Sequence, residues 1–286
     1  MKNPKKRTPT VSKANALTVK RSNSEAVLQQ SGLTFWDHLD ELRTVLLKSL
    51  AAWIVCTIGA FCCKDLLFSW LFAPTSSDFV LYRALCRLAQ WTGWSALCPG
   101  ELEVSFLNTE LTAQFMTHVE VSLWAGFVLA LPLMVYWLYG FVSPALYERE
   151  KRYSFSLVIS ATVLFLLGVL LDYFLIFPFS FRFLSSYQVN DLVVNQISLS
   201  SYISLFVVLA LLMGLLFEVP VVTWFLAKMG LLNASHLRAG RKYVFVAILI
   251  LAAVITPTGD PFTLLLVTLP IYALYELSIL LIRRNN

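Results

Sequence analysis

Residue types that commonly carry out chemistry are sparse in this chain. It has three histidines, His38, His118 and His236, and five cysteines, and neither type shows the spacing of a zinc site. The sequence also has no G-x-S-x-G elbow and no phosphate-binding P-loop. We therefore expect no enzyme activity, no metal and no other cofactor.

A single acid interrupts a long apolar run. Glu218 lies within Phe217-Glu218-Val219-Pro220, in a stretch otherwise suited to crossing a membrane. A charged side chain at the centre of a bilayer costs about 3 kcal/mol or more and usually faces protein or water. Glu218 is therefore a functional candidate, and the alternative is an internal hydrogen bond to a neighbouring span. Asp172 and Glu276 lie nearer the ends of apolar runs, where a structural role is expected: Asp172 could reach the interface, and Glu276 is close to Arg283.

The elements that must position these residues are membrane helices. The chain has 286 residues, of which 58% are apolar and 14% charged, far from the composition of a soluble domain. Only helices and closed barrels satisfy their backbone groups in hydrocarbon, and continuous apolar runs favour helices. We predict an all-α integral membrane protein with six transmembrane helices, at residues 45–63, 119–141, 155–177, 202–226, 243–255 and 262–282.

The distribution of lysine and arginine predicts the orientation. Nine lie before or at Lys48, three between spans two and three, four between spans four and five, and two at the C-terminus. The alternate segments hold three, one and none. Because cytosolic flanks are enriched in positive charge, both termini are expected in the cytosol.

The first 33 residues form a separate region. They are polar and basic and show no apolar periodicity, so residues 1–33 are predicted to be a disordered cytosolic tail and residues 34–286 the membrane domain. The tail could contact anionic lipid heads or remain solvated.

Five motifs, in order along the chain, resemble the TatC family, the receptor component of the twin-arginine protein translocase. They are His38-Leu39-Asp40-Glu41-Leu42-Arg43, Ala73-Pro74, the run from Phe141 to Glu150 that contains Pro144, Phe217-Glu218-Val219-Pro220, and Thr256-Pro257-Thr258-Gly259-Asp260. Two positions depart from the family pattern, Glu120 where a lysine is common and Leu264 where a glutamine is common. The resemblance implies a kinked, concave TatC-like bundle.

The resemblance also implies a binding site for signal peptides with two consecutive arginines. A guanidinium group matches a carboxylate bidentately, whereas lysine offers only a point charge. Glu41 and Glu150 are both expected near the cytosolic face, so together they could read the arginine pair, and the motifs add His38, Arg43 and Phe141 to the site. The alternative is ordinary surface pairing of these carboxylates with neighbouring basic residues.

Partners are implied in the same way. Glu218 and Pro220 are expected to contact the single-span proteins TatA and TatB, and the chain is expected to self-associate in a larger complex in the bacterial inner membrane. The proton motive force would drive export of folded precursors, and no nucleic acid is expected. Pro74, Pro144 and Asp260 are expected to shape functional or structural loops.

Three further patterns refine this picture. Internal prolines at Pro132, Pro220 and Pro270 predict bent helices around a concavity. Cys86 and Cys98 could form a disulfide if their loop faces an oxidising periplasm. The fifth span, Tyr243–Ile255, has 13 residues and covers about 20 Å, less than a hydrocarbon core of about 30 Å.

Two other classes of protein remain open. A secondary transporter would share the helices and the intramembrane acid, but should show related halves with paired broken helices, and no repeat is evident between residues 45–141 and 202–282. A membrane-embedded enzyme would need a convergent nucleophile and base or a metal site, which the motifs do not supply.

Overall fold

The computed structural model describes residues 35–93, 98, 105–108, 110–142, 154–188, 190, 195–255 and 260–285. The chain divides into two units, residues 1–47 and 48–286, and each is described on its own. The predicted tail at residues 1–33 lies outside the described residues.

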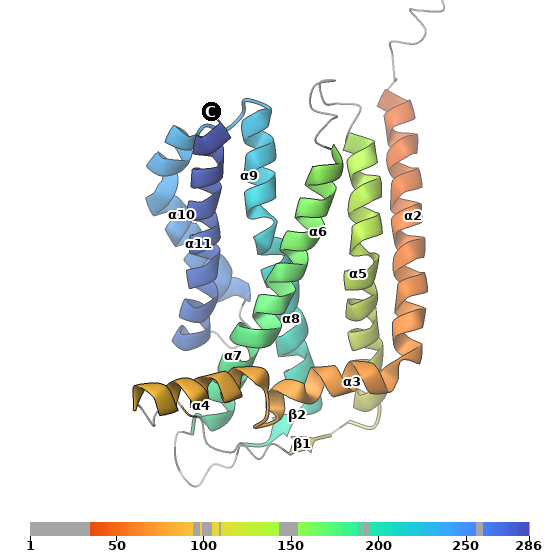
Figure 1. Ribbon diagram of the computed structural model, residues 1–286. Helices are drawn as coiled ribbons and strands as arrows, with labels where there is room; N and C mark the ends of the chain where they lie inside the picture. Colours follow the sequence, from red (N-terminus) through yellow and green to blue (C-terminus); the bar gives the residue numbers. More distant parts are fainter. Residues whose placement is uncertain are drawn as a thin grey trace, which may run out of the picture. The chain divides into compact units, whose positions relative to one another are not determined.

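Long apolar helices dominate the described part of the chain. Helix α2 (Phe35–Cys62) begins in the first unit and continues into the second. Figure 1 shows the elements of the second unit in sequence colours. The other helices of this group are α5 (Ala113–Val142), α6 (Ser154–Leu171), α8 (Leu199–Phe217) with the ten-residue α9 (Val219–Lys228) that follows it, α10 (Ala234–Ile255) and α11 (Pro261–Asn285).

Shorter helices lie across one end of these long ones. Helices α3 (Lys64–Phe72) and α4 (Val80–Thr92), joined by the 3-10 turn η1 (Ala73–Thr75), run transverse to α5, α6 and α8 (Figure 1). Pro74 is buried in the turn between them, and Gly93 ends α4 at φ 76°, a left-handed conformation that glycine adopts without steric cost. Strands β1 (Phe106–Leu107) and β2 (Ile197–Ser198) form a short parallel pair at the same end.

Buried tyrosine hydroxyls anchor the transverse helices to the long ones. The Tyr202 hydroxyl, on α8, donates to the Leu71 carbonyl of α3 at 2.6 Å. The Tyr82 hydroxyl of α4 is 3.2 Å from the Pro74 carbonyl and 3.4 Å from the Pro178 carbonyl. Each bond satisfies a polar group that would otherwise be buried without a partner, which is costly away from water.

The centre of the core lies between α6 and α8. Ile176, Ile203, Leu209 and Met213 are completely buried there. A Cβ atom on Gly168 of α6 would collide with the Met213 carbonyl, and one on Gly214 of α8 would lie 2.7 Å from the Phe165 ring. The two helices therefore cross at a separation that only glycine permits, as is common where membrane helices pack.

A π-helical turn changes the prediction for the third span. The π turn η5 (Asp172–Ile176) follows α6 directly and leads into α7 (Phe177–Ser186). The helical path therefore continues past the predicted end at Phe177, and the apolar segment runs from Leu157 to Ser186. In the π turn the Phe177 amide donates to the Asp172 carbonyl, and this wider hydrogen-bond spacing lets the helix continue through Pro178, which has no amide hydrogen.

Among the described residues, five helical segments are long and apolar enough to cross a membrane. They correspond to predicted spans one to four and six, whose bounds they match to within a few residues or exceed. Predicted span five lies inside α10, whose first turns carry Arg238, Arg241 and Lys242 ahead of the apolar stretch. The count of six spans and the positions of the termini stay predictions.

The three internal prolines behave differently. Pro132 and Pro270 lie inside α5 and α11 without ending them. Pro220 marks a break, because α8 ends at Phe217 and α9 begins at Val219, with Glu218 between them. Of the three prolines, only Pro220 thus coincides with an interruption of the helix.

Candidate functional site

The first predicted carboxylate lies on an exposed turn of α2. Glu41 Oε2 is 3.9 Å from Nδ1 of His38, one helical turn earlier, and the Glu41 side chain is 42% exposed. Arg43, two residues later, is exposed. This part of α2 thus offers a carboxylate that a guanidinium group from solution can reach.

The second carboxylate cannot be placed. Glu150 and Pro144 lie outside the described residues, and Phe141 is half-buried at the last turn of α5. The proximity of Glu41 and Glu150 therefore stays a prediction.

Glu218 lies at the junction of α8 and α9. Its backbone conformation is helical, with φ −75° and ψ −14°, and its side chain is half-buried. The backbone of Phe165, on α6, contacts the carboxyl group. Pro220, in the first turn of α9, is buried and cannot donate a hydrogen bond. The Glu218 carboxyl group lies one helical turn after Gly214, where α6 and α8 cross closely. It is partly exposed on the surface of an apolar segment.

Asp260, Pro74 and the cysteine pair each have a defined structural role. Asp260 caps α11, because its Oδ2 accepts from the Thr263 amide at 2.7 Å, which is an ordinary N-terminal capping role. Pro74 shapes the turn between α3 and α4. Cys86 and Cys98 are joined in a disulfide that links α4 to the segment after it.

Tyr82 shows how α4 is held against α7. The Arg182 guanidinium carbon lies 5.3 Å from the centre of the Tyr82 ring, within the range of a cation–π contact. Burial raises the pKa of the Tyr82 hydroxyl, and the positive charge of Arg182 opposes that rise. The Arg182 side chain therefore makes an intramolecular contact with the Tyr82 ring.

Asp172 differs from its prediction. It is completely buried in the π turn, and among the described residues neither of its carboxyl oxygens has a hydrogen-bond partner. Its side chain is enclosed by the protein and is not exposed on the helix surface. Single π turns inside α-helices often mark functional positions, but the sequence carries no signal that distinguishes one from a regular turn.

Replacing Asp172 by asparagine is expected to preserve or raise thermal stability. A buried carboxylate without a partner is costly, and asparagine has the same shape but no charge. The measurement is the midpoint of thermal unfolding in detergent. Asp260→Ala serves as the comparison, since loss of the α11 cap should cost about 1 kcal/mol. A lower midpoint for Asp172→Asn than for Asp260→Ala would show that Asp172 has an essential partner.

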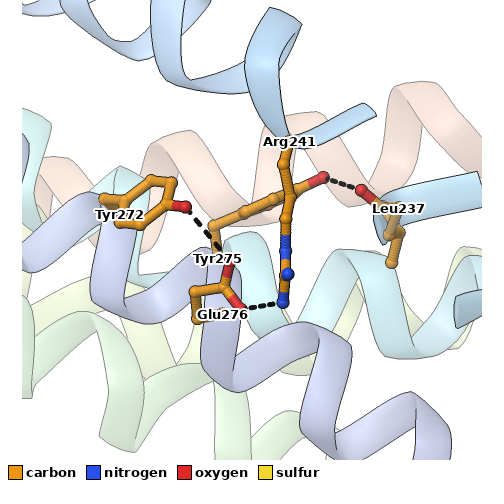
Figure 2. Close-up of polar contacts among 5 residues, drawn as sticks. All are labelled: Leu237, Arg241, Tyr272, Tyr275 and Glu276. Atoms are coloured by element: carbon orange, nitrogen blue, oxygen red, sulfur yellow. Dashed lines mark hydrogen bonds and ion pairs between the residues drawn. The ribbon is translucent and has the colours of Figure 1, made fainter. Parts of the chain in front are cut away.

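Glu276 forms an ion pair with a distant residue. Its Oε2 lies 2.6 Å from a terminal guanidinium nitrogen of Arg241, on α10. The Tyr272 hydroxyl donates to the same carboxylate at 3.2 Å, and the Tyr275 hydroxyl donates to the Leu237 carbonyl at 2.6 Å. Figure 2 shows these contacts. These contacts tie α10 to α11, so Glu276 has the structural role that the sequence indicated.

The chain is similar to TatC proteins over most of its length. The family model of the Sec-independent protein translocase protein (TatC) matches residues 37–270. The TatC protein of Blattabacterium sp. subsp. Periplaneta americana is 35% identical over 256 residues, which are 88% of this chain and 95% of that protein. The TatC protein of Helicobacter pylori (strain ATCC 700392 / 26695) is 38% identical over 249 residues, 87% of each chain.

A solved structure shows the same fold. The crystal structure of the twin arginine translocase receptor TatC in DDM aligns with a TM-score of 0.70 at 30% identity, over 86% of this chain and 99% of that one. The described apolar helices, the intramembrane glutamate at the α8–α9 break and these matches point to one conclusion. The chain is a multi-pass membrane protein that belongs to the TatC family of the Sec-independent, twin-arginine protein translocase.

Proposed function

We propose that this chain is the signal-peptide receptor of a twin-arginine translocase. Its substrates are folded precursors whose signal peptides carry two consecutive arginines. The observation that carries the proposal is the exposed carboxylate of Glu41 on the first turns of α2, within a family match that begins at residue 37. The aligned crystal structure is described as a twin arginine translocase receptor, which supports the same role for this chain.

In this proposal Glu41 and Glu150 each bind one guanidinium group. His38 and Arg43 flank Glu41 and set the local charge, and Phe141 provides an apolar surface beside the loop that carries Glu150. A hydrogen bond to a charged group contributes about 1.5–3 kcal/mol. Two bidentate pairs therefore suffice to distinguish Arg-Arg from Lys-Lys, because lysine cannot form the second bond of each pair.

The same proposal fixes the topology. Six spans place both termini in the cytosol of a bacterial inner membrane, as the distribution of lysine and arginine favours. Glu218, with Pro220, contacts a polar group on TatA-type or TatB-type single-span partners within a larger complex, and the proton motive force drives transport. No specific observation favours a secondary transporter.

The test is photo-crosslinking from position 39 to a twin-arginine precursor. The photoreactive residue replaces Leu39, because a label at position 41 would itself remove the Glu41 carboxylate, and Glu41→Gln and Glu150→Gln are introduced separately. Each is expected to reduce the crosslink by about tenfold, the loss of one charged hydrogen bond. A precursor with Lys-Lys should lose the crosslink to the unchanged chain.

The matched control is Asp40→Asn, which removes a neighbouring acid on the same exposed turn of α2. It should leave the crosslink unchanged. The proposal fails if the Lys-Lys precursor crosslinks as well as the Arg-Arg precursor, or if Asp40→Asn and Glu41→Gln have equal effects.

A further inference from the structure

An open cleft lies between α3, α4 and the π turn of the third span. Its volume is about 360 Å³. Apolar and aromatic groups form one part of the lining, and four polar side chains form the other. The lining includes Trp70, Asp78, Val80, Arg83, Tyr173 and Phe174.

The cleft carries one positive and one negative side chain. Asp78 lies two residues before the start of α4 and Arg83 lies in its first turn, and both side chains are exposed. Among the described residues neither forms an ion pair. By contrast, Arg182 on the neighbouring α7 is engaged with Tyr82. The cleft thus presents an unpaired guanidinium group and an unpaired carboxylate on the same helix end.

The position of the cleft along the third span sets its depth in the membrane. The apolar segment Leu157–Ser186 has 30 residues, more than the about 20 helical residues that a hydrocarbon core of about 30 Å holds, so part of it extends beyond the hydrocarbon. Helices α3 and α4 lie across one end of the long helices (Figure 1), and the cleft joins them to the third span there, because Phe79 packs on Phe174 at 5.9 Å and on Tyr173 at 5.6 Å between ring centres. The cleft therefore opens where acyl chains end and headgroups begin.

The exposed apolar side chains around the cleft fit this depth. Trp70 is 63% exposed, Val80 56% and Phe174 41%. The Trp70 backbone carbonyl accepts a hydrogen bond from the Tyr173 hydroxyl at 2.8 Å, so the wall that these two residues form is fixed in place. Tryptophan and tyrosine are enriched at the boundary between hydrocarbon and headgroups. Such a surface suits acyl chains and the glycerol region better than water.

We propose that this cleft binds a zwitterionic phospholipid of the phosphatidylethanolamine class. The phosphate binds Arg83, whose guanidinium group matches phosphate oxygens bidentately, and the ammonium group binds Asp78. The acyl chains lie against Trp70, Val80 and Phe174. A phosphatidylglycerol headgroup has no cation for Asp78 and binds less tightly. With the orientation proposed above, the lipid belongs to the outer leaflet, but the binding itself does not depend on that orientation.

The test measures lipid retention by the purified full chain in native mass spectrometry. Delipidated protein is mixed separately with phosphatidylethanolamine, phosphatidylglycerol and diacylglycerol. Arg83→Gln is expected to reduce phosphatidylethanolamine retention about fivefold, the effect of a partly exposed ion pair of about 1 kcal/mol. Asp78→Asn is expected to reduce retention of phosphatidylethanolamine and not of phosphatidylglycerol.

The matched control is Arg87→Gln, which removes an exposed arginine one turn later on α4 that does not line the cleft. It should leave retention unchanged. Equal effects of Arg83→Gln and Arg87→Gln would overturn the proposal, and so would diacylglycerol retention as high as that of phosphatidylethanolamine.

A second measurement needs no variant. A phosphatidylethanolamine with a photoreactive group near its glycerol should label peptides that contain Trp70 to Arg83 or Tyr173 to Phe174. Labelling elsewhere only, or covering of the cleft by a second copy of the chain in crosslinking, would also overturn it.

Discussion

Replacing Gly168 by alanine is expected to lower the stability of the helical bundle by about 3 kcal/mol, the upper part of the range for overpacked cores. The added Cβ would collide with the Met213 backbone carbonyl of α8. A backbone carbonyl inside a helix cannot rotate away, as a flexible side chain could. The helices α6 and α8 must therefore separate, and the completely buried Leu209 and Met213 lose contacts with α6.

The measurement is the midpoint of thermal unfolding in detergent, followed by size-exclusion chromatography. Gly59→Ala is the matched control, because Gly59 is also helical and nothing lies within 4 Å of its added Cβ. That variant is expected to gain about 1 kcal/mol from helix propensity. If the two alanine variants unfolded at the same midpoint, the close crossing would not contribute to stability.

Replacing Glu218 by alanine is expected to reduce export of a twin-arginine precursor at least tenfold while leaving precursor binding unchanged. The carboxyl group lies half-buried at the break between α8 and α9, where a polar group of a partner helix can pair with it. Loss of a hydrogen bond to a charged group costs about 1.5–3 kcal/mol, which is about tenfold to a hundredfold in an equilibrium constant. Glu218→Gln keeps hydrogen-bonding capacity and should retain part of the activity.

Export is measured in inverted membrane vesicles, and precursor binding by the crosslink from Leu39. Glu120→Ala is the control, since Glu120 is a second half-buried acid in an apolar span, on α5. Normal export by Glu218→Ala would contradict the proposed partner contact. A defect of the same size in Glu120→Ala would show that any intramembrane acid matters and that position 218 is not special.

The apolar helices could be predicted from the sequence because hydrocarbon requires every backbone polar group to bond within its own helix. The π turn at Asp172–Ile176 could not, since one shifted hydrogen bond leaves no trace in hydropathy. The helix continues through Pro178, because the wider turn removes the need for an amide at that position.

Among the polar residues, contacts between neighbours in the sequence could be predicted and contacts between distant residues could not. The N-terminal capping by Asp260 follows from local spacing, and the sequence indicated a turn there. The ion pair of Glu276 could not be predicted, because Arg241 lies 35 residues away on another helix and only tertiary packing brings the two together. The pairing of Glu41 with Glu150 rests on topology, which local sequence patterns do not determine.

The hydrogen bond from Tyr202 to the Leu71 carbonyl has a consequence for biogenesis. The two residues are 131 positions apart, so α3 leaves the ribosome long before the tyrosine that anchors it. At synthesis rates of about 5–20 residues per second, the delay is on the order of ten seconds. During that interval the exposed apolar side chains of α3, Leu66 and Trp70 among them, have no completed core to pack on. We therefore expect α3 of the nascent chain to stay bound at the bilayer surface or to an insertion factor until α8 has been inserted.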